Sequence, residues 1–235
     1  MRVLLTNDDG YLAPGLRALA EAVSALGLQG AIVAPSAQMS GASRSRRGGP
    51  AAWARAEPVA GIPVIHVAGT PAACVLFALT SGVLPRFDLC LSGINAGENL
   101  GAALTVSGTY GAVLEAASYG VPGVALSREF GGPWNEPLTW DWSWVAGAAR
   151  RTLETLLAER DGWFTANVNL SGTDRGADPA RTRVSRTHYY TDRYDLARAG
   201  IVSTIGYPAA VLDPDDDIRA FGEEKRTSVT LFPRA

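Results

Sequence analysis

The chain is poor in the residues that several common classes of functional site require. Its two histidines and two cysteines are too few for a disulfide framework and form no zinc-binding pattern. Lys225 is the only lysine and the formal net charge is −2, so no basic stripe is dense enough for a nucleic acid duplex. No apolar run approaches the length of a membrane span, and charge arrives at Asp8, too early for a signal peptide. We therefore expect a cytoplasmic protein that binds neither duplex nucleic acid nor a membrane.

The chain is rich in apolar sequence arranged as alternating strands and helices. Hydrophobic residues make up 47% and charged residues 19% of its 235 residues, which suits one large α/β domain. Apolar runs predict strands at residues 3–5, 31–35, 62–67, 87–91, 121–127 and 163–170. Helical spacing predicts helices at residues 16–26, 70–79, 108–119 and 145–156. This alternation favours an α/β sandwich of three layers, with a mostly parallel, doubly wound sheet in the middle.

The sequence changes in character from Thr182 onward. Residues 184–190 and 201–205 alternate between polar and apolar, which predicts β-hairpin structure added to the sheet domain. Two strands alone bury too little surface to be stable, so such a hairpin needs a partner surface. We expect residues 1–180 to form the core, and residues 181–235 to form a C-terminal arm that completes the same domain and contributes to an oligomer interface.

Two adjacent carboxylates, Asp8 and Asp9, follow the first predicted strand. Like charges at the end of a buried strand repel each other, and burial adds to the cost of each. A divalent cation offsets both penalties, and ligands bind at the carboxyl ends of strands in open α/β sheets. We therefore interpret the two aspartates as metal ligands. The alternative is a solvated turn, because Asn, Asp and Gly are all favoured in turns.

Two further strand ends carry small oxygen-bearing side chains, Ser40 and Asn95. With right-handed crossovers, these ends and the two aspartates share one edge of a parallel sheet. Two carboxylates, a hydroxyl and an amide oxygen form an all-oxygen set suited to Mg²⁺ or Mn²⁺. Ser40 in a simple turn and Asn95 capping its own loop are the alternatives.

A third feature is the segment Ser107-Gly108-Thr109, which opens a predicted helix. Free N–H groups and the helix dipole favour an anion at such an end. Ser and Thr are also ordinary N-cap residues, which is the alternative interpretation. A metal ion beside an anion-binding helix end provides the groups that phosphoryl transfer to water requires.

Together these motifs resemble the SurE (stationary-phase survival protein) family of metal-dependent nucleotidases. The resemblance runs from residue 2 to about residue 170, and the matching blocks are Thr6-Asn7-Asp8-Asp9-Gly10, Ala13-Pro14-Gly15-Leu16, Val33-Ala34-Pro35 with Ser40-Gly41, Gly69-Thr70-Pro71-Ala72 with Cys74-Val75, Ser92-Gly93-Ile94-Asn95 with Gly97, Asn99-Leu100-Gly101, Ser107-Gly108-Thr109 and Asn167-Val168-Asn169. The Asn7-Asp8-Asp9-Gly10 block and the block from Ser92 to Asn99 are highly specific at this separation.

The resemblance implies a Rossmann-like core and a homodimer or homotetramer built partly by an exchanged C-terminal arm. It also implies release of phosphate from nucleoside 5'- or 3'-monophosphates, with one Mg²⁺ or Mn²⁺ per subunit. Carried onto this sequence, the metal ligands are Asp8, Asp9, Ser40 and Asn95. One of the two aspartates would act as general base or nucleophile. The residues expected around the phosphate are Asn99, Ser107, Gly108 and Thr109.

The chain departs from the family pattern in places that bear on substrate choice and assembly. Ala73 stands where the family usually has Asp, and Val106 replaces a common tyrosine. The stretch at residues 203–207 differs from the usual C-terminal pattern. After Ser40-Gly41 the chain carries Arg44, Arg46 and Arg47, either as a solvated loop or as contacts to substrate phosphate, which Arg binds bidentately.

Other α/β families match the sequence less well. A receiver domain needs an Asp at its third strand end, which residues 67–69 do not offer, and a haloacid dehalogenase needs Asp-x-Asp rather than two adjacent aspartates. The Rossmann glycine fingerprint is missing after the first strand. Two alternatives stay open: a SurE-like phosphatase for another phosphorylated metabolite, and a non-catalytic phospholigand-binding homologue.

His66 and both cysteines are expected in the core. Tryptophans 134, 140, 142 and 144 belong to the core or an interface, or stack on a base.

Overall fold

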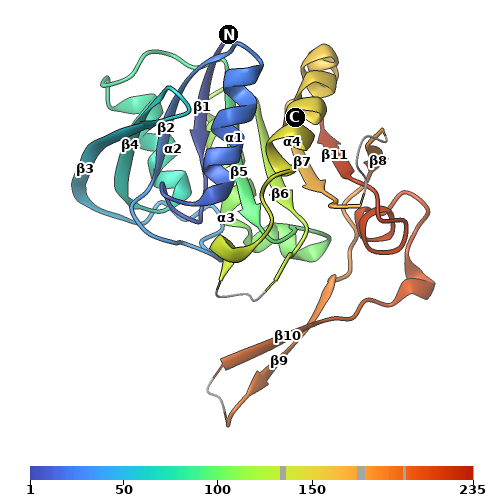
Figure 1. The fold of residues 1–235 in the computed structure, drawn as a ribbon. Coiled ribbons are helices and arrows are strands. Elements are labelled where there is room, and N and C mark those ends of the chain that lie inside the picture. Colours follow the sequence, from blue (N-terminus) through green and yellow to red (C-terminus); the bar gives the residue numbers. More distant parts are fainter. Residues whose placement is uncertain (133–135, 174–177, 198–199, 235) are drawn as a thin grey trace.

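A nine-stranded sheet forms the centre of the protein, whose computed structural model describes residues 1–132, 136–173, 178–197 and 200–234 (Figure 1). The order of its strands is β3-β4-β2-β1-β5-β6-β7-β11-β8. Their bounds are β1 (Arg2–Thr6), β2 (Gln29–Pro35), β3 (Gly48–Val59), β4 (Ile62–Gly69), β5 (Leu89–Ala96), β6 (Gly123–Arg128), β7 (Thr165–Leu170), β8 (Ala180–Thr182) and β11 (Ser228–Phe232). All strands from β4 to β7 are parallel, which confirms the predicted α/β fold.

Helices cover both faces of this sheet. On one face α1 (Pro14–Ala25) packs beside α4 (Val145–Ala158), and on the other α2 (Pro71–Thr80) packs beside α3 (Gly108–Ser118) (Figure 1). Single helical turns occur at η1 (Ala102–Val106), η2 (Pro137–Thr139), η3 (Arg160–Gly162), η4 (Ala209–Val211) and the π-helical η5 (Arg219–Glu223). Within the described ranges, no helix has the length and apolarity needed to cross a membrane.

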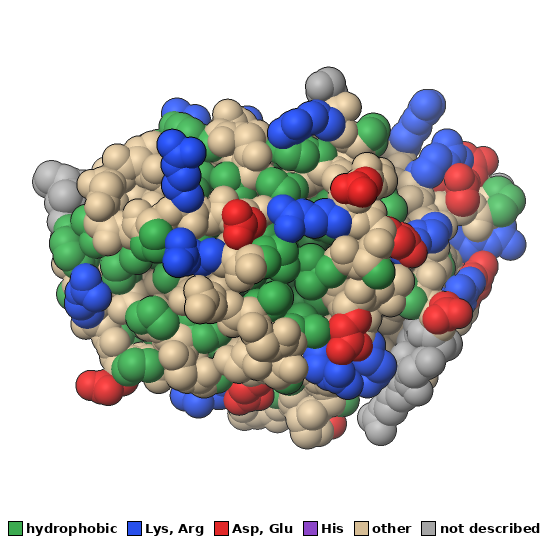
Figure 2. Space-filling view, turned by 90° about the horizontal axis from the view of Figure 1, so that it is seen from above, with side chains coloured by type: hydrophobic (Ala, Val, Ile, Leu, Met, Phe, Trp, Pro, Cys, Tyr) green, Lys and Arg blue, Asp and Glu red, His purple; other side chains and the backbone are tan. Residues whose placement is uncertain are grey.

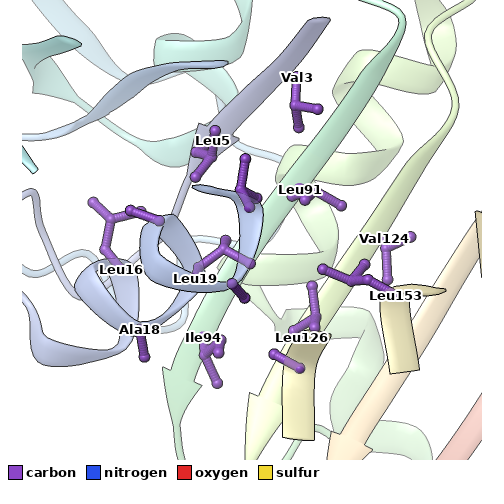
Figure 3. Packing of buried hydrophobic residues seen from close by; sticks show 14 of the residues in the cluster. Val3, Leu5, Leu16, Ala18, Leu19, Leu91, Ile94, Val124, Leu126 and Leu153 are labelled. Carbon is purple, nitrogen blue, oxygen red and sulfur yellow. The ribbon is translucent and has the colours of Figure 1, made fainter. Parts of the chain in front are cut away.

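The alternation of side chains along the strands divides the core into two clusters. Val3 and Leu5 of β1 point toward α1 and α4, where they join Leu19 and Leu153 in the larger cluster (Figure 3). Leu4 lies on the opposite face, with residues of α2 and α3. Successive strand residues face opposite sides of a sheet, so an uninterrupted apolar run such as that of β1 fits a strand covered on both faces.

The order of the strands places a crevice between β1 and β5. From β1 the chain adds β2 and β4 on one side, and β5, β6 and β7 lie on the other. In doubly wound sheets, ligands bind outside the carboxyl ends of the strands at this reversal of strand order. The residues that follow β1 and those that end β5 therefore lie at the expected position of a site.

The structure corrects several sequence predictions at the ends of the sheet. β5 continues beyond residue 91 to Ala96, residues 184–190 contain almost no strand, and β3 and β11 were not predicted. β3 is an edge strand containing Pro58, and proline is tolerated there because one edge needs no partner strand. β11 pairs antiparallel with β7, although more than fifty residues separate them in the chain. Such a pairing has no local sequence signal.

A C-terminal antiparallel hairpin is present, as predicted, but it forms a separate sheet that projects from the domain (Figure 1). It consists of β9 (Tyr190–Asp195) and β10 (Gly200–Ile205). The Tyr190 hydroxyl at its base donates a hydrogen bond to the buried carboxylate of Glu98. Tyr194 and Ile201, by contrast, are 66% and 67% exposed, so the hairpin carries apolar surface that its own chain leaves uncovered.

Charged side chains of both signs are interspersed on the face seen from above, where β1 begins (Figure 2). Apolar atoms lie between many of these charged side chains, and some acidic and basic groups adjoin (Figure 2). The carboxyl ends of the parallel strands lie on the opposite side of the molecule (Figure 1).

Candidate functional site

Asp8 and Asp9 lie in the tight turn that follows β1. The Asn7 side chain donates to the carbonyl of Gly10 (2.9 Å) and closes this turn, and the amide of Met39 donates to the carbonyl of Asp8 (2.7 Å). Asp8 is 4% exposed. The Oδ2 atom of Asp9 accepts a hydrogen bond from the amide of Ala96, at the end of β5 (3.1 Å). The two carboxylates are thus fixed in the crevice between β1 and β5.

The electrostatics of the two aspartates favour a bound cation. Burial, followed by the neighbouring charge of Asp9, raises the pKa of Asp8 to about 7, and burial also raises the pKa of Asp9. Hydrogen bonds from Thr109 and Ala96 oppose these rises only in part. In the described part of the chain, neither carboxylate forms an ion pair with a basic side chain. The donor set is hard oxygen, which matches Mg²⁺ or Mn²⁺.

The N-terminus of α3 abuts Asp8. The Thr109 hydroxyl donates to Oδ1 of Asp8 (2.7 Å), while the Ser107 hydroxyl accepts the amide of Tyr110 (3.1 Å) as an N-cap. A Cβ atom at Gly108 would lie 2.8 Å from Oδ2 of Asp8, so glycine is what lets the helix approach so closely. The structure therefore brings residues 107–109 together with Asp8. It also shows the capping role of Ser107.

Ser40, in the loop after β2, and Asn95, near the end of β5, are each next in the chain to a residue bonded to one of the two aspartates. Ser40 follows Met39, whose amide is bonded to Asp8, and Asn95 precedes Ala96, whose amide is bonded to Asp9. The Asn95 amide nitrogen donates to the carbonyl of Gly97 (2.7 Å), which leaves Oδ1 as the atom that could bind a cation. The Ser40 hydroxyl accepts from Gln38 (3.2 Å). Among the described residues no cluster of three His, Cys, Asp or Glu side chains forms a metal site, so any cation here would depend on these neutral oxygens.

Asn99 is bonded to β6 and β7. Its amide group donates to the hydroxyl of Ser127 (2.8 Å), and its backbone N–H donates to Oδ1 of Asn169 (2.7 Å). Its carbonyl accepts from Asn167 (2.9 Å) and more distantly from Asn169 (3.2 Å). Asn167 and Asn169 thus hold the loop after β5 in place. Two asparagines within a fully buried strand were the sequence signal for this role.

The loop that carries Arg44, Arg46 and Arg47, called the arginine loop below, is anchored on α3 by Glu115. The sequence analysis assigned this residue no role. Glu115 is fully buried, and its carboxylate lies 2.9 Å from Nε of Arg44 and 2.8 Å from a terminal nitrogen of Arg46. Arg47 forms no ion pair within the described ranges and lines a cavity of 1110 Å³ together with Ser40. The signal in the sequence was a lone acid on an otherwise apolar helix.

The aromatic rings near the site pack against other side chains of the protein. The guanidinium of Arg128, at the end of β6, lies 4.9 to 5.3 Å from the ring centroids of Trp140, Trp142 and Trp144. Trp134 lies outside the described residues. His66 stacks on Tyr11 at 4.5 Å, and its Nδ1 is 2.9 Å from the hydroxyl of Ser36. The three tryptophans therefore form a cation–π cluster around Arg128.

Comparison with known proteins agrees with these motifs. The family model "Survival protein SurE" matches residues 3–191. A "5'-nucleotidase SurE" from Thermococcus gammatolerans is 35% identical, with 98% of this chain and 89% of that protein covered. One of the same name from Hyphomonas neptunium is 34% identical over 94% of this chain and 88% of its own length. The crystal structure of SurE from Aquifex aeolicus is similar with a TM-score of 0.75 at 27% identity, covering 100% of this chain and 94% of that one. The chain belongs to the SurE family.

Proposed function

We propose that this protein is a metal-dependent phosphomonoesterase that hydrolyses nucleoside 5'- or 3'-monophosphates to nucleoside and phosphate. The observation that carries the proposal is the adjacent pair of buried Asp8 and half-buried Asp9, which has no basic partner in the described structure and whose Asp8 is bonded to the first turn of α3. The name "5'-nucleotidase" of relatives that align over nearly the whole chain supports the same activity.

The residues that would hold one Mg²⁺ or Mn²⁺ per subunit are Asp8, Asp9, Ser40 and Asn95. When bound, such an ion polarises a phosphoryl oxygen and lowers the pKa of a coordinated water. Residues of the chain itself orient the two carboxylates. Thr109 fixes Oδ1 of Asp8, and the amide of Ala96 fixes Oδ2 of Asp9, so both carboxylates are oriented by the protein itself.

One of the two aspartates removes a proton from the attacking water or attacks phosphorus directly. The amides at the start of α3, near Gly108 and Thr109, are donors for the charge that builds up on the phosphoryl oxygens. Asn99 and Ser107 complete the expected phosphate environment. Asn99 acts there partly through the loop that its bonds to β6 and β7 hold in place.

The activity is tested by measuring phosphate release from 5'-AMP with Mn²⁺ and with EDTA. We expect turnover only with the metal, and its loss in Asp9→Asn. Asp161→Asn, an exposed acid in η3, is the matched control. Turnover of p-nitrophenyl phosphate without turnover of nucleotides would indicate another phosphorylated metabolite as substrate. Binding of phosphate esters with no turnover at all would indicate a non-catalytic phospholigand-binding protein.

The protein is also proposed to be a homodimer or homotetramer. The projecting hairpin exposes Tyr194, Ile201 and Ile205 at 62% or more, and two isolated strands are marginally stable without a partner surface. A second copy is the simplest partner. Light scattering should give at least a dimer at micromolar concentration, and a monomer would contradict the proposal.

The two free, buried cysteines suit a reducing compartment, and we propose the cytoplasm.

A further inference from the structure

The cavity beside Ser40 adjoins the candidate site through that serine, and the phosphatase reaction itself assigns it no role. It measures 1110 Å³, enough for a small ligand, and its polar lining residues include Ser36, Gln38, Ser40, Arg46, Arg47 and Thr70. No carboxylate is among the described residues that line it. Because Ser40 forms part of its wall, the portion of a substrate beyond the bound phosphate would extend into it.

The loop that forms one wall of this cavity is held at both ends. On one side the Ser43 hydroxyl donates to the carbonyl of Thr105 (3.0 Å), and a Cβ atom on Gly111 of α3 would overlap the backbone of Ser43. On the other side the amide of Thr70 donates to the carbonyl of Arg47 (2.8 Å), and the Thr70 hydroxyl donates to the carbonyl of Ser45. The backbone that carries the arginines is therefore fixed before any ligand binds.

Glu115 forms ion pairs with two of the three arginines of this loop. Its buried carboxylate pairs with Arg44 and Arg46, which commits these guanidinium groups to holding the loop on α3. Arg47 is exposed, lines the cavity and has no ion-pair partner in the described structure. One cation is thus presented at the cavity wall without a carboxylate to neutralise it. Arg binds phosphate and carboxylate bidentately, so an anion is its natural ligand.

We propose that this cavity is a subsite for a second anionic group of the substrate, with Arg47 as its principal contact. The substrate class is then a phosphomonoester that carries another phosphate or carboxylate on the part that leaves, such as a nucleoside bisphosphate. The proposal rests on the proposed function, because the first phosphate is placed at Asp8, Asp9, Ser40 and Asn95. Arg47 acts on binding and specificity, and the chemistry at the first phosphate does not involve it.

The test compares adenosine 3',5'-bisphosphate with 5'-AMP, using initial rates of phosphate release with Mn²⁺. The native protein should have the lower KM for the bisphosphate. Arg47→Ala should raise that KM about 5- to 30-fold, as loss of a partly screened charge-assisted contact does, and leave KM for 5'-AMP and both kcat values nearly unchanged. Arg47→Lys should restore part of the affinity. Arg55→Ala is the matched control, because Arg55 is an exposed arginine of β3 that does not line the cavity.

Two results would overturn the subsite. One is equal KM values for the two nucleotides in the native protein, and the other is an equal effect of Arg47→Ala on both. If the native protein released phosphate from neither nucleotide, the proposed function would fall instead. Calorimetric titration of the same two nucleotides into the metal-free protein would then decide the subsite. Tighter binding of the bisphosphate, abolished by Arg47→Ala, supports it, and equal affinities refute it.

Discussion

Replacement of Asp8 by Asn should stabilise the metal-free protein at neutral and alkaline pH. Burial and the charge of Asp9 raise the pKa of Asp8 from 3.8 to about 7. At 1.36 kcal/mol for each pH unit, this difference corresponds to an upper limit of about 4 kcal/mol. The folded state holds the proton more tightly than the unfolded state, so the free energy of unfolding falls as the pH rises from about 4 to about 7. Asn cannot ionise and avoids this loss.

The assay is thermal unfolding in EDTA at pH 5 and pH 8. Even a third of the upper limit would raise the Tm of Asp8→Asn above that of the native protein by roughly 3–6 °C at pH 8, for a domain of this size. At pH 5, where most Asp8 is already protonated, the difference should be smaller. Addition of Mn²⁺ should then reverse the order, because only the native protein has both carboxylates for the ion.

A lower Tm for Asp8→Asn than for the native protein in EDTA at pH 8 would refute this reasoning. So would a difference that does not depend on pH. Asp161→Asn, which removes an exposed acid, should show neither effect.

Two further predictions concern the elements that support the site. Gly108→Ala places a methyl group 2.8 Å from Oδ2 of Asp8, so Mn²⁺ affinity measured by calorimetry should fall about tenfold or more, and unchanged affinity would show that α3 moves away freely. Glu115→Gln removes the acceptor charge for Arg44 and Arg46, so trypsin should cut the loop at Arg44–Arg47 faster, with little change in Tm. Glu154→Gln, which breaks the surface pair with Arg150 on α4, is its control and should leave the cleavage rate unchanged.

The parts of the fold that were predictable from sequence are those with a strong local pattern. β1 is an apolar run that stops at two acids, and α1 repeats apolar residues at helical spacing, so both were predicted close to their observed positions. β3 contains Pro58 and lies at an edge, and β11 returns to β7 from the far end of the chain, so neither has a local signal. The predicted strand at residues 184–190 was wrong because alternation alone does not supply a pairing partner.

The same distinction applies to the candidate site. Asp8 and Asp9 stand out because two adjacent carboxylates after an apolar strand need an explanation in any fold. The roles of Glu115, Asn167 and Asn169 depend on partners about 70 residues away in the chain, which only the folded structure brings into contact. The same holds for Arg47, whose isolation from carboxylates becomes visible only once Arg44 and Arg46 are seen on Glu115.

We propose that Asp8, Asp9, Ser40 and Asn95 together hold the ion on which phosphate release depends. Anomalous diffraction from a crystal grown with Mn²⁺ tests it most directly. We expect one strong peak per subunit, within coordination distance of side-chain oxygens from all four residues, and no such peak in crystals of Asp8→Asn. A peak bound by other residues, or a crevice between β1 and β5 without metal at millimolar Mn²⁺, would contradict it.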